Sequence, residues 1–449
     1  MKRRHFIKAG MAGMIATPVL AAEPVQTQKH QTSDHAITWS RKIPVRYEAD
    51  IAVIGGGIAG VSAACAAAKS GASVILVERF AVTGGVLTTG GVANFSGQMA
   101  QQGEVFEQIV KHLKTWNALG YGKDSVFHYE ILAIILQEML LRRKVKLLLH
   151  TRFIDAKVND SGRIKACLVC GKSGIEAIQA KQFIDCTGEA DLARYAGFET
   201  LKGGPSGYQL PMSMMYFVRH VDPEHAQAHL PQGWFDPVTS QKELPMTSPW
   251  PDGPGGTALK IKIPMFDATD TQSLTQAEIA ARRRMMEVLD YFQRQQKKAW
   301  ILDHCSPIIG IREGSRIVGD YILKVDDLRA GRAFEDGVAR GTYQLDGHKP
   351  DDDKRTYILP KDELKVPPYQ IPLRSLIARD AKNLMMAGRC VSADQLALSS
   401  ARVSTTGSMM GQAAGITTAL CVDNKCDPRD VDPETVKRIV KDRGGYLDV

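Results

Sequence analysis

Short apolar runs that end in glycine alternate along this chain with stretches whose apolar positions recur at helical spacing. Residues 49–54 are largely apolar and run directly into three glycines, which is typical of a buried parallel strand. The alanine-rich stretch 57–70 predicts a helix that ends at Gly71, and residues 72–78 predict a second strand. Strand, glycine turn, helix and strand in this order predict a βαβ unit.

The same two patterns continue to about residue 421. Helical spacing predicts helices near 104–119, 127–143, 275–299 and 406–421. Apolar or alternating runs predict strands near 146–151, 154–158, 163–170, 181–185, 212–219, 308–324 and 384–388. Glycine and proline are frequent over 200–270, so this stretch is expected to consist mostly of loops around the strand near 212–219. Residues 329–370 are also expected to be rich in loops.

Residues 1–22 have the three parts of an export signal. The segment Arg3-Arg4-His5-Phe6-Ile7-Lys8 resembles a twin-arginine signal, a weakly apolar stretch comes after it, and small residues near Ala21 offer a cleavage site. We therefore expect the twin-arginine machinery to export the chain, to a periplasm or otherwise out of the cytoplasm, with residues 23–48 as a polar linker. The other interpretation is a basic tail on a cytosolic enzyme.

The composition argues against several classes of partner. The formal net charge is +8, and four of these charges lie in the predicted signal, which leaves +4 for the mature chain. So small an excess does not indicate nucleic acid. No apolar run is long enough to span a bilayer, no Cys-x-x-Cys-His motif could attach haem, and no cluster of His and Cys has metal-ligand spacing. We expect no membrane span after signal removal and no bound metal.

A glycine motif lies where the βαβ unit needs one. Gly55, Gly57 and Gly60 fit Gly-x-Gly-x-x-Gly between the first strand and the first helix, and this context makes the motif informative. Gly55 permits a tight turn, Gly57 lets a pyrophosphate approach backbone amides, and Gly60 lets the helix pack closely on the strand. Glu78 ends the second strand, where its carboxylate can accept hydrogen bonds from a ribose. These features predict a dinucleotide site.

The segment after Glu78 favours FAD over NAD. Arg79 and two small-residue loops, Gly84-Gly85 and 88–91, come directly after it, and an extended FAD needs such loops to run past its pyrophosphate. Residues 183–191 resemble the strand-to-Thr-Gly segment that lies against the nucleotide in two-dinucleotide flavoproteins. A helix that opens near 405–407 could direct its N-terminus at the flavin N1/C2=O edge. The full set of residues expected to contact FAD is Gly55, Gly57, Ile58, Ala59, Gly60, Glu78, Arg79, Gly84, Gly85, Thr88, Phe153, Thr187, Gly188, Gly388, Arg389, Thr406 and Gly407.

Four further segments carry a resemblance to a known family: 310–321 (GIREGSRIVGDY), 343–348 (YQLDGH), 369–372 (YQIP) and 383–415. Over about residues 49–421 the sequence resembles the FAD-dependent oxidoreductases that are related to the flavoprotein subunits of succinate dehydrogenase and fumarate reductase. The family often has two adjacent arginines where this chain has Ser315-Arg316. Its membrane-complex relatives attach FAD to a histidine in the loop after the acidic residue, but residues 84–97 contain none, so we expect non-covalent FAD.

The expected fold is α/β, with a discontinuous Rossmann-type FAD-binding domain and an inserted α+β substrate domain. The predicted boundaries are 1–22 for the signal, 23–48 for the linker, 49–200 and 371–421 for the two parts of the FAD-binding domain, 201–370 for the substrate domain and 422–449 for a C-terminal tail.

The flavin would supply hydride chemistry, so the protein must hold a substrate and manage a proton. Arg312 and Arg402 are candidates to hold a substrate carboxylate, with Arg316 and Arg374 as further arginines to consider. His348 could move a proton near neutral pH. Each of these residues could instead serve only in a structural contact.

The sequence therefore predicts an exported FAD-dependent dehydrogenase or reductase that acts on a small organic molecule. Because no second dinucleotide motif is present, a separate electron donor or acceptor is expected, with a quinone or a cytochrome as the candidates. Two alternatives stay open. One is a flavin-carrying electron-transfer protein without substrate chemistry, and the other is an NAD(P)H-fed flavin monooxygenase.

Overall fold

The computed structural model describes residues 37–226, 230–231, 233–253 and 255–449. The predicted export signal at 1–22 and the first part of the predicted linker lie outside these residues. The last part of that linker belongs to the first strand, because β1 begins at Val45 and pairs with β6 from there onward.

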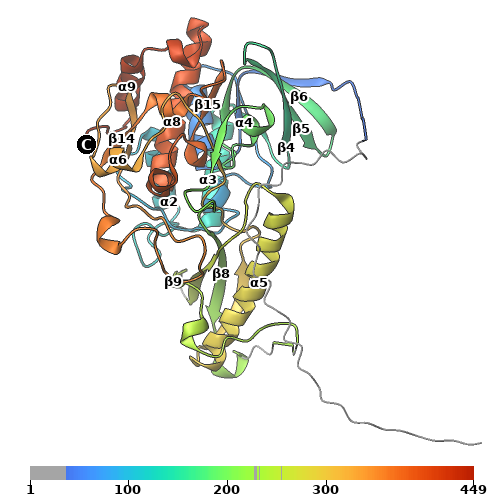
Figure 1. Ribbon diagram of the computed structural model, residues 1–449, viewed down its shortest axis with the longest axis vertical. Coiled ribbons are helices and arrows are strands. Elements are labelled where there is room, and N and C mark those ends of the chain that lie inside the picture. The colour runs from blue at the N-terminus through green and yellow to red at the C-terminus, as the bar shows by residue number, and fades with distance from the viewer. Residues whose placement is uncertain (1–36, 227–229, 232, 254) are drawn as a thin grey trace, which may run out of the picture. The chain divides into compact units, whose positions relative to one another are not determined.

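A seven-stranded sheet forms the centre of the FAD-binding domain (Figure 1). Its order is β3-β2-β1-β6-β5-β4, and β15 pairs with β6. Strands β3, β2, β1, β6 and β15 run parallel, whereas β4 and β5 are antiparallel additions beyond β6. The strands are β1 (Val45–Ile54), β2 (Val74–Val77), β3 (Lys146–Leu148), β4 (Arg152–Val158), β5 (Ile164–Gly171), β6 (Gly174–Asp185) and β15 (Leu384–Met386).

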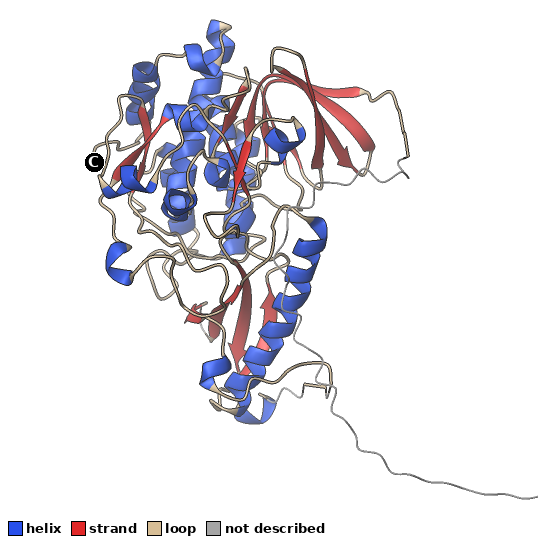
Figure 2. Cartoon of the chain, in the orientation of Figure 1, coloured by secondary structure: helices blue, strands red, loops and turns tan. Residues whose placement is uncertain are grey.

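Alternate residues of β1 face two different cores, as the period of a strand requires. Ile51 and Val53 pack with the helices on one face, and Ala52 and Ile54 pack with Phe153 and its neighbours on the other. The helices of the first face are α1 (Ile58–Lys69), α2 (Glu104–Thr115), α3 (Tyr129–Arg142) and α8 (Ser404–Asn424). Figure 2 shows blue helices packed beside the red strands of this domain. This helix-covered parallel sheet is the predicted α/β fold.

A four-stranded antiparallel sheet in the order β11-β8-β10-β9 forms the inserted domain. Its strands are β8 (Met212–His220), β9 (Thr247–Pro251), β10 (Gly256–Ile263) and β11 (Trp300–Cys305), and the long helix α5 (Thr271–Arg294) packs on β8 and β10 (Figure 1). Met214 and Tyr216 face α5, whereas Met215 and Phe217 face Val92 of the FAD-binding domain.

Most of the chain that follows this sheet packs against the first domain, as do two short elements that precede it. The remaining elements are α4 (Asp191–Tyr195), β7 (Thr200–Lys202), β12 (Ser315–Ile317), α6 (Val325–Arg329), β13 (Gly337–Gly341), β14 (Tyr369–Pro372), α7 (Gln395–Ala401) and α9 (Pro433–Asp442). Residues from 323 to 371 share a core with α8, so the predicted substrate domain of 201–370 is longer than the inserted sheet and its helix. Val436, Val440 and Leu447 are buried in the same core, and the predicted C-terminal tail of 422–449 is thus packed against α8.

The strand predicted over 308–324 is wrong. Only Ser315–Ile317 forms a strand there, as β12 against β7. A β-carbon at Gly314 would lie 2.8 Å from Cα of Glu189, and one at Gly319 would lie 2.9 Å from the carbonyl oxygen of Arg374. The glycines allow the backbone to pass tightly between other segments, which breaks up a regular strand. Among the described residues, no helix is both long and apolar enough to cross a membrane.

Candidate functional site

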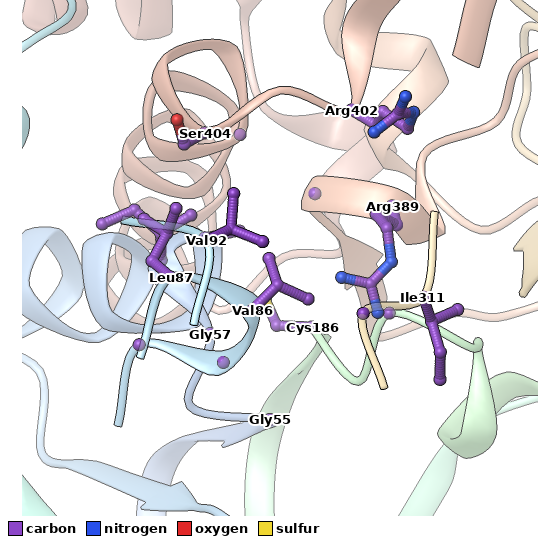
Figure 3. A pocket seen from close by; sticks show the side chains of 18 of the residues that line it. Gly55, Gly57, Val86, Leu87, Val92, Cys186, Ile311, Arg389, Arg402 and Ser404 are labelled. Carbon is purple, nitrogen blue, oxygen red and sulfur yellow. The ribbon is translucent and has the colours of Figure 1, made fainter. Parts of the chain in front are cut away.

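A large cavity opens at the carboxyl ends of β1, β6 and β15, where ligands bind in open α/β sheets. It contains about 1900 Å3 of space not filled by atoms, part of it open to solvent. Figure 3 shows Gly55 and Gly57 at the junction of β1 and α1, with Arg389, Arg402 and Ser404 contributed by the C-terminal part of the chain. The inserted sheet supplies another part of the wall through Ser213, Trp250, Lys260 and the loop 308–312.

The three motif glycines have three different surroundings. Gly55 has φ +102°, and a β-carbon there would clash with the backbone of Cys186. A β-carbon at Gly60 would clash with the carbonyl oxygen of Gly55, so this glycine lets α1 pack against the end of β1 and does not line the cavity. A β-carbon at Gly57 would meet no atom within 4 Å, and Gly57 lines the cavity. Gly57 therefore leaves space for a ligand.

Glu78 fixes the glycine turn from the end of β2. One of its carboxylate oxygens accepts a hydrogen bond from the backbone N–H of Gly56 at 2.7 Å, and the other accepts from the N–H of Phe80 at 2.9 Å. Burial raises the pKa of Glu78, while these backbone hydrogen bonds oppose the rise. Each carboxylate oxygen has more than one lone pair, so Glu78 can also accept from a ribose hydroxyl on its cavity side.

The loop that contains Gly84 and Gly85 docks against the first glycine turn. The N–H of Gly84 donates to the carbonyl oxygen of Gly56 at 2.8 Å, and both Gly84 and Gly85 adopt positive φ. Thr88 is buried below this loop, where its hydroxyl donates to the carbonyl oxygen of Thr83 at 2.8 Å. Gly84 and Gly85 line the cavity, whereas Thr88 supports the loop from behind.

A carboxylate bridges two arginines on the wall. Glu189 accepts from Arg389 at 2.6 Å and from Arg79 at 3.3 Å, and all three residues line the cavity. Nearby Asp191 has its pKa raised to about 6, first by burial and then by the charge of Glu189. This cluster holds the turn after β6 against the segment after β15.

Asp185 fixes the Thr187-Gly188 turn at the end of β6. Its buried carboxylate accepts from the N–H of Thr187 at 3.0 Å and from the Thr187 hydroxyl at 2.7 Å. Gly188 has φ +86°, and a β-carbon there would clash with the guanidinium group of Arg389. Both turn residues line the cavity, together with Gly388 from the end of β15 and Phe153 from β4.

The N-termini of α1 and α8 meet at the cavity. The two helices pack so closely that a β-carbon at Gly411 would clash with the carbonyl oxygen of Ala59, and one at Gly415 with that of Ala63. The glycines of α8 thus allow this close approach. Neither N-terminus is capped by a side chain, so the free amides of both first turns are available to a ligand.

Two uncapped helix ends at one cavity favour negatively charged groups. Ser404 at the start of α8 lines the cavity, and its buried hydroxyl has no partner among the described residues. Gly407 also lines the cavity, whereas Thr406 is buried beside it and does not. These features fit FAD, whose pyrophosphate and flavin N1/C2=O edge are the parts that such helix ends stabilise.

The opposite wall carries Arg312, Arg402, Asp346, Tyr343 and Lys260. Arg402 donates to the Asp346 carboxylate at 2.8 Å. Although burial alone would raise the pKa of Asp346, the hydrogen bond from His348 and the charges of Arg402 and Arg312 hold that pKa well below its usual range. Asp346 is therefore the negative charge among three cations.

His348 lies behind this wall and does not line the cavity. Its Nε2 is 3.3 Å from Asp346, its Nδ1 is 3.3 Å from the carbonyl oxygen of Thr356, and its ring stacks on Tyr357 at 4.5 Å between centroids. Burial lowers the pKa of His348. In this arrangement His348 orients Asp346, and a role in moving a proton to a substrate stays a prediction.

The structure gathers most of the predicted residues at one cavity. Of the predicted cofactor residues, all line it except Gly60, Thr88 and Thr406, and of the predicted catalytic residues Arg312 and Arg402 line it. Arg316 instead pairs with Glu313, and Arg374 pairs with Asp336 away from the cavity. No local motif distinguishes Lys260, Trp250 or Ser213 from other strand residues, so the sequence did not predict that they line the cavity.

Several solved structures have a similar arrangement of elements. They include OxyS anhydrotetracycline hydroxylase from Streptomyces rimosus, with 11% identity, a TM-score of 0.46, and coverage of 88% of this chain and 66% of that one. They also include a geranylgeranyl bacteriochlorophyll reductase-like protein from Thermoplasma acidophilum, with 12% identity, a TM-score of 0.44, and coverage of 89% and 92%. A search of curated proteins by sequence found no match.

The match to a sequence family is more specific. The family model described as FAD dependent oxidoreductase matches residues 50–440, which include every element around the cavity from the end of β1 through most of α9. The glycine turns, the buried Glu78 and the two converging helix ends are the parts of the site that such a cofactor requires. The chain belongs to the FAD-dependent oxidoreductase family.

Proposed function

We propose that this protein is an exported FAD-dependent dehydrogenase or reductase that transfers hydride between a small organic substrate and the flavin N5. The observation that carries the proposal is a single cavity with two chemically different walls. One wall has the glycine turns and uncapped helix ends, and the other has Arg312, Arg402 and Lys260. A flavin carrier without substrate chemistry would not need the second, charged wall.

FAD supplies a two-electron donor or acceptor when it is bound. The residues of the first wall hold it through backbone N–H groups at Gly57 and at the start of α8, and through the Glu78 carboxylate. The residues of the second wall hold and orient the substrate. Val92 and Ile311 line the same cavity and help to exclude water from the reacting groups.

The first test identifies the bound cofactor and measures its oxidation and reduction. Purified mature protein should be yellow, and acid should release FAD rather than FMN. A screen of organic donors under anaerobic conditions, and of acceptors after reduction by dithionite, should find compounds that bleach or reoxidise the flavin. Absence of flavin, or flavin that stays with the denatured chain, would contradict non-covalent FAD.

The electron partner is proposed to be a separate protein or a quinone, because the sequence contains one dinucleotide motif. Stopped-flow mixing of the oxidised holoprotein with NADH or NADPH should therefore bleach the flavin only slowly. Bleaching at ~1 per second or faster, within the range of ordinary turnover, would favour the NAD(P)H-fed monooxygenase instead.

Export is proposed from the sequence of residues 1–22 alone. Replacement of Arg3 and Arg4 by lysine keeps the charge but removes the paired guanidinium groups. The mature protein should then be missing from the exported fraction, while the unchanged chain is exported with FAD bound. Continued export of the Arg3→Lys, Arg4→Lys chain would point to a different route.

A further inference from the structure

Two cations on the second wall have no carboxylate partner within the residues that the structure describes. Lys260 extends from β10, and its ammonium group lies 5.9 Å from the ring centroid of Trp250. Arg312 donates to the carbonyl oxygen of Pro211, a neutral acceptor, and pairs with no acid in the described part of the chain. Both side chains line the cavity.

Two neighbouring cations, Lys262 and Arg402, each have an acidic partner, in contrast to Lys260 and Arg312. Lys262, two residues along the same face of β10, is buried, donates to a backbone carbonyl oxygen and lies 3.7 Å from Asp352. Arg402 has Asp346. Since Asp346 neutralises one positive charge, Lys260 and Arg312 leave the wall with an excess of two.

This excess is costly where water is limited. Arg312 is only 7% exposed, and an uncompensated buried charge is strongly unfavourable. Burial, followed by the charge of Arg402, lowers the pKa of Arg312 to about 10. Burial, followed by the charge of Arg312, lowers the pKa of Lys260 to about 8. A bound anion would relieve both effects.

The surroundings of these cations are apolar and contain two free hydrogen-bonding groups. Trp250, Ile309 and Ile311 line the same cavity. The buried Nε1 of Trp250 and the buried hydroxyl of Ser213 have no partner in the described part of the chain. An occupant with an anionic group, an apolar body and a hydrogen-bond acceptor would match these groups.

We propose that Lys260 and Arg312 form a subsite for the carboxylate of the substrate, an organic acid whose apolar body packs on Trp250. This inference rests on the proposed function and specifies its substrate class. The two side chains differ in what they contribute, because the guanidinium fork of Arg312 can hold two carboxylate oxygens and the ammonium group of Lys260 acts as a point charge.

The test uses the FAD-loaded full-length mature protein and four probes. Benzoate and benzamide have the same size and differ in charge, acetate lacks the apolar body, and inorganic phosphate is an anion of another class. Binding is measured by isothermal titration calorimetry and by the change in the flavin absorbance spectrum. FAD content is measured first in every sample, so a failure of the cofactor claim is recognised separately.

Two variants are compared, each of which replaces a lysine that lies beside a tryptophan ring. Lys260→Met removes the proposed contact, and Lys298→Met removes an exposed lysine that lies 5.7 Å from the ring of Trp300, away from the cavity. The unchanged protein should bind benzoate about tenfold or more tightly than benzamide or acetate. Lys260→Met should weaken benzoate binding about tenfold or more and leave benzamide binding and FAD content unchanged. Lys298→Met should change none of these values.

Several results would overturn the proposal. Equal affinity for benzoate and benzamide would remove the charge recognition, and tighter binding of phosphate than of benzoate would assign the subsite to another anion. Loss of FAD from Lys260→Met without a change in benzoate affinity per holoprotein would mean that the cation serves the cofactor. If Lys260→Met does not fold, Lys260→Gln and Arg312→Gln provide the same comparison.

Discussion

The two walls of the cavity are built from different kinds of residue. The wall at the ends of β1 and β6 consists mainly of glycines and backbone amides, held in place by Glu78 and Asp185. The wall from β9, β10 and the loop 308–312 consists of long side chains, with Trp250, Lys260 and Arg312 in contact with the cavity. The first presents the backbone to a ligand, and the second presents side chains.

Because of this difference, the two walls should tolerate amino-acid substitutions differently. A backbone site requires a particular residue at each close approach, because any side chain would fill the space that the ligand or a neighbouring segment needs. A side-chain site can be redesigned by substitution without loss of the fold, so the substrate can differ among proteins that share the same cofactor. Substitutions in the two walls should accordingly have different consequences.

The largest effect is expected for Gly60→Ala. The new methyl group would clash with the carbonyl oxygen of Gly55 and force α1 away from β1. We expect a loss of about 3 kcal/mol in the free energy of unfolding, with FAD lost as well. Urea unfolding monitored by circular dichroism measures the first quantity, and stability equal to that of the unchanged chain would show that the helix is not packed as tightly as described.

Gly57→Ala should separate cofactor binding from folding. Its methyl group meets no protein atom within 4 Å, and the backbone of Gly57, at φ −63° and ψ 176°, is accessible to alanine. The apo fold should therefore survive, while FAD affinity falls by about tenfold or more because the methyl group occupies ligand space. Fluorescence titration of the apoprotein with FAD gives the affinity. Unchanged affinity would place the pyrophosphate elsewhere.

Glu78→Gln tests the carboxylate that holds the glycine turn. The amide replacement leaves one oxygen and puts an NH2 group opposite a backbone N–H of Gly56 or Phe80, so one of two buried hydrogen bonds is lost. We expect a cost of about 1 kcal/mol or more in stability and weaker FAD binding. Thermal unfolding of apo and FAD-loaded protein distinguishes the two contributions, and a variant as stable as the parent in both forms would contradict the assignment.

The smallest effect concerns pH and the second wall. The charges that face Lys260 are Arg312, Arg402, Arg355 and Asp346, and burial together with the charge of Arg312 lowers the pKa of Lys260 to about 8. A carboxylate ligand needs the protonated lysine, so benzoate affinity should be constant from pH 6 to 7 and fall about fivefold by pH 9.

The matched variant decides whether Lys260 is responsible for this pH dependence. Lys260→Met should have weaker affinity that no longer changes over the same range, since Arg312 stays protonated there and the pKa of Asp346 is far below it. Benzoate titrations by calorimetry at each pH provide the comparison. The same decline in Lys260→Met would assign the titration to another group.

The sequence predicted the first wall in considerable detail. The glycine spacing after an apolar run and the acidic residue at the end of β2 lie within a single βαβ unit, and the small-residue loops follow it directly, so local patterns were sufficient to identify them. The strands and helices of this unit also lie close to their predicted bounds. The extra strand at 308–324 was predicted from its strand-like pattern, but tight packing of Gly314 and Gly319 against distant segments interrupts it.

By itself, the sequence thus determined the fold class and the glycine turns of the first βαβ unit, because these depend on residues near one another in the chain. Only the tertiary structure decided that Lys260, Trp250 and Arg312 share a cavity with these turns, and that His348 lies behind Asp346 instead of lining the cavity. The local sequence around a strand residue looks the same whether its side chain faces solvent, a core or a ligand. What distinguishes Lys260 is that no carboxylate pairs with it among the described residues, and that depends on the packing of the whole domain.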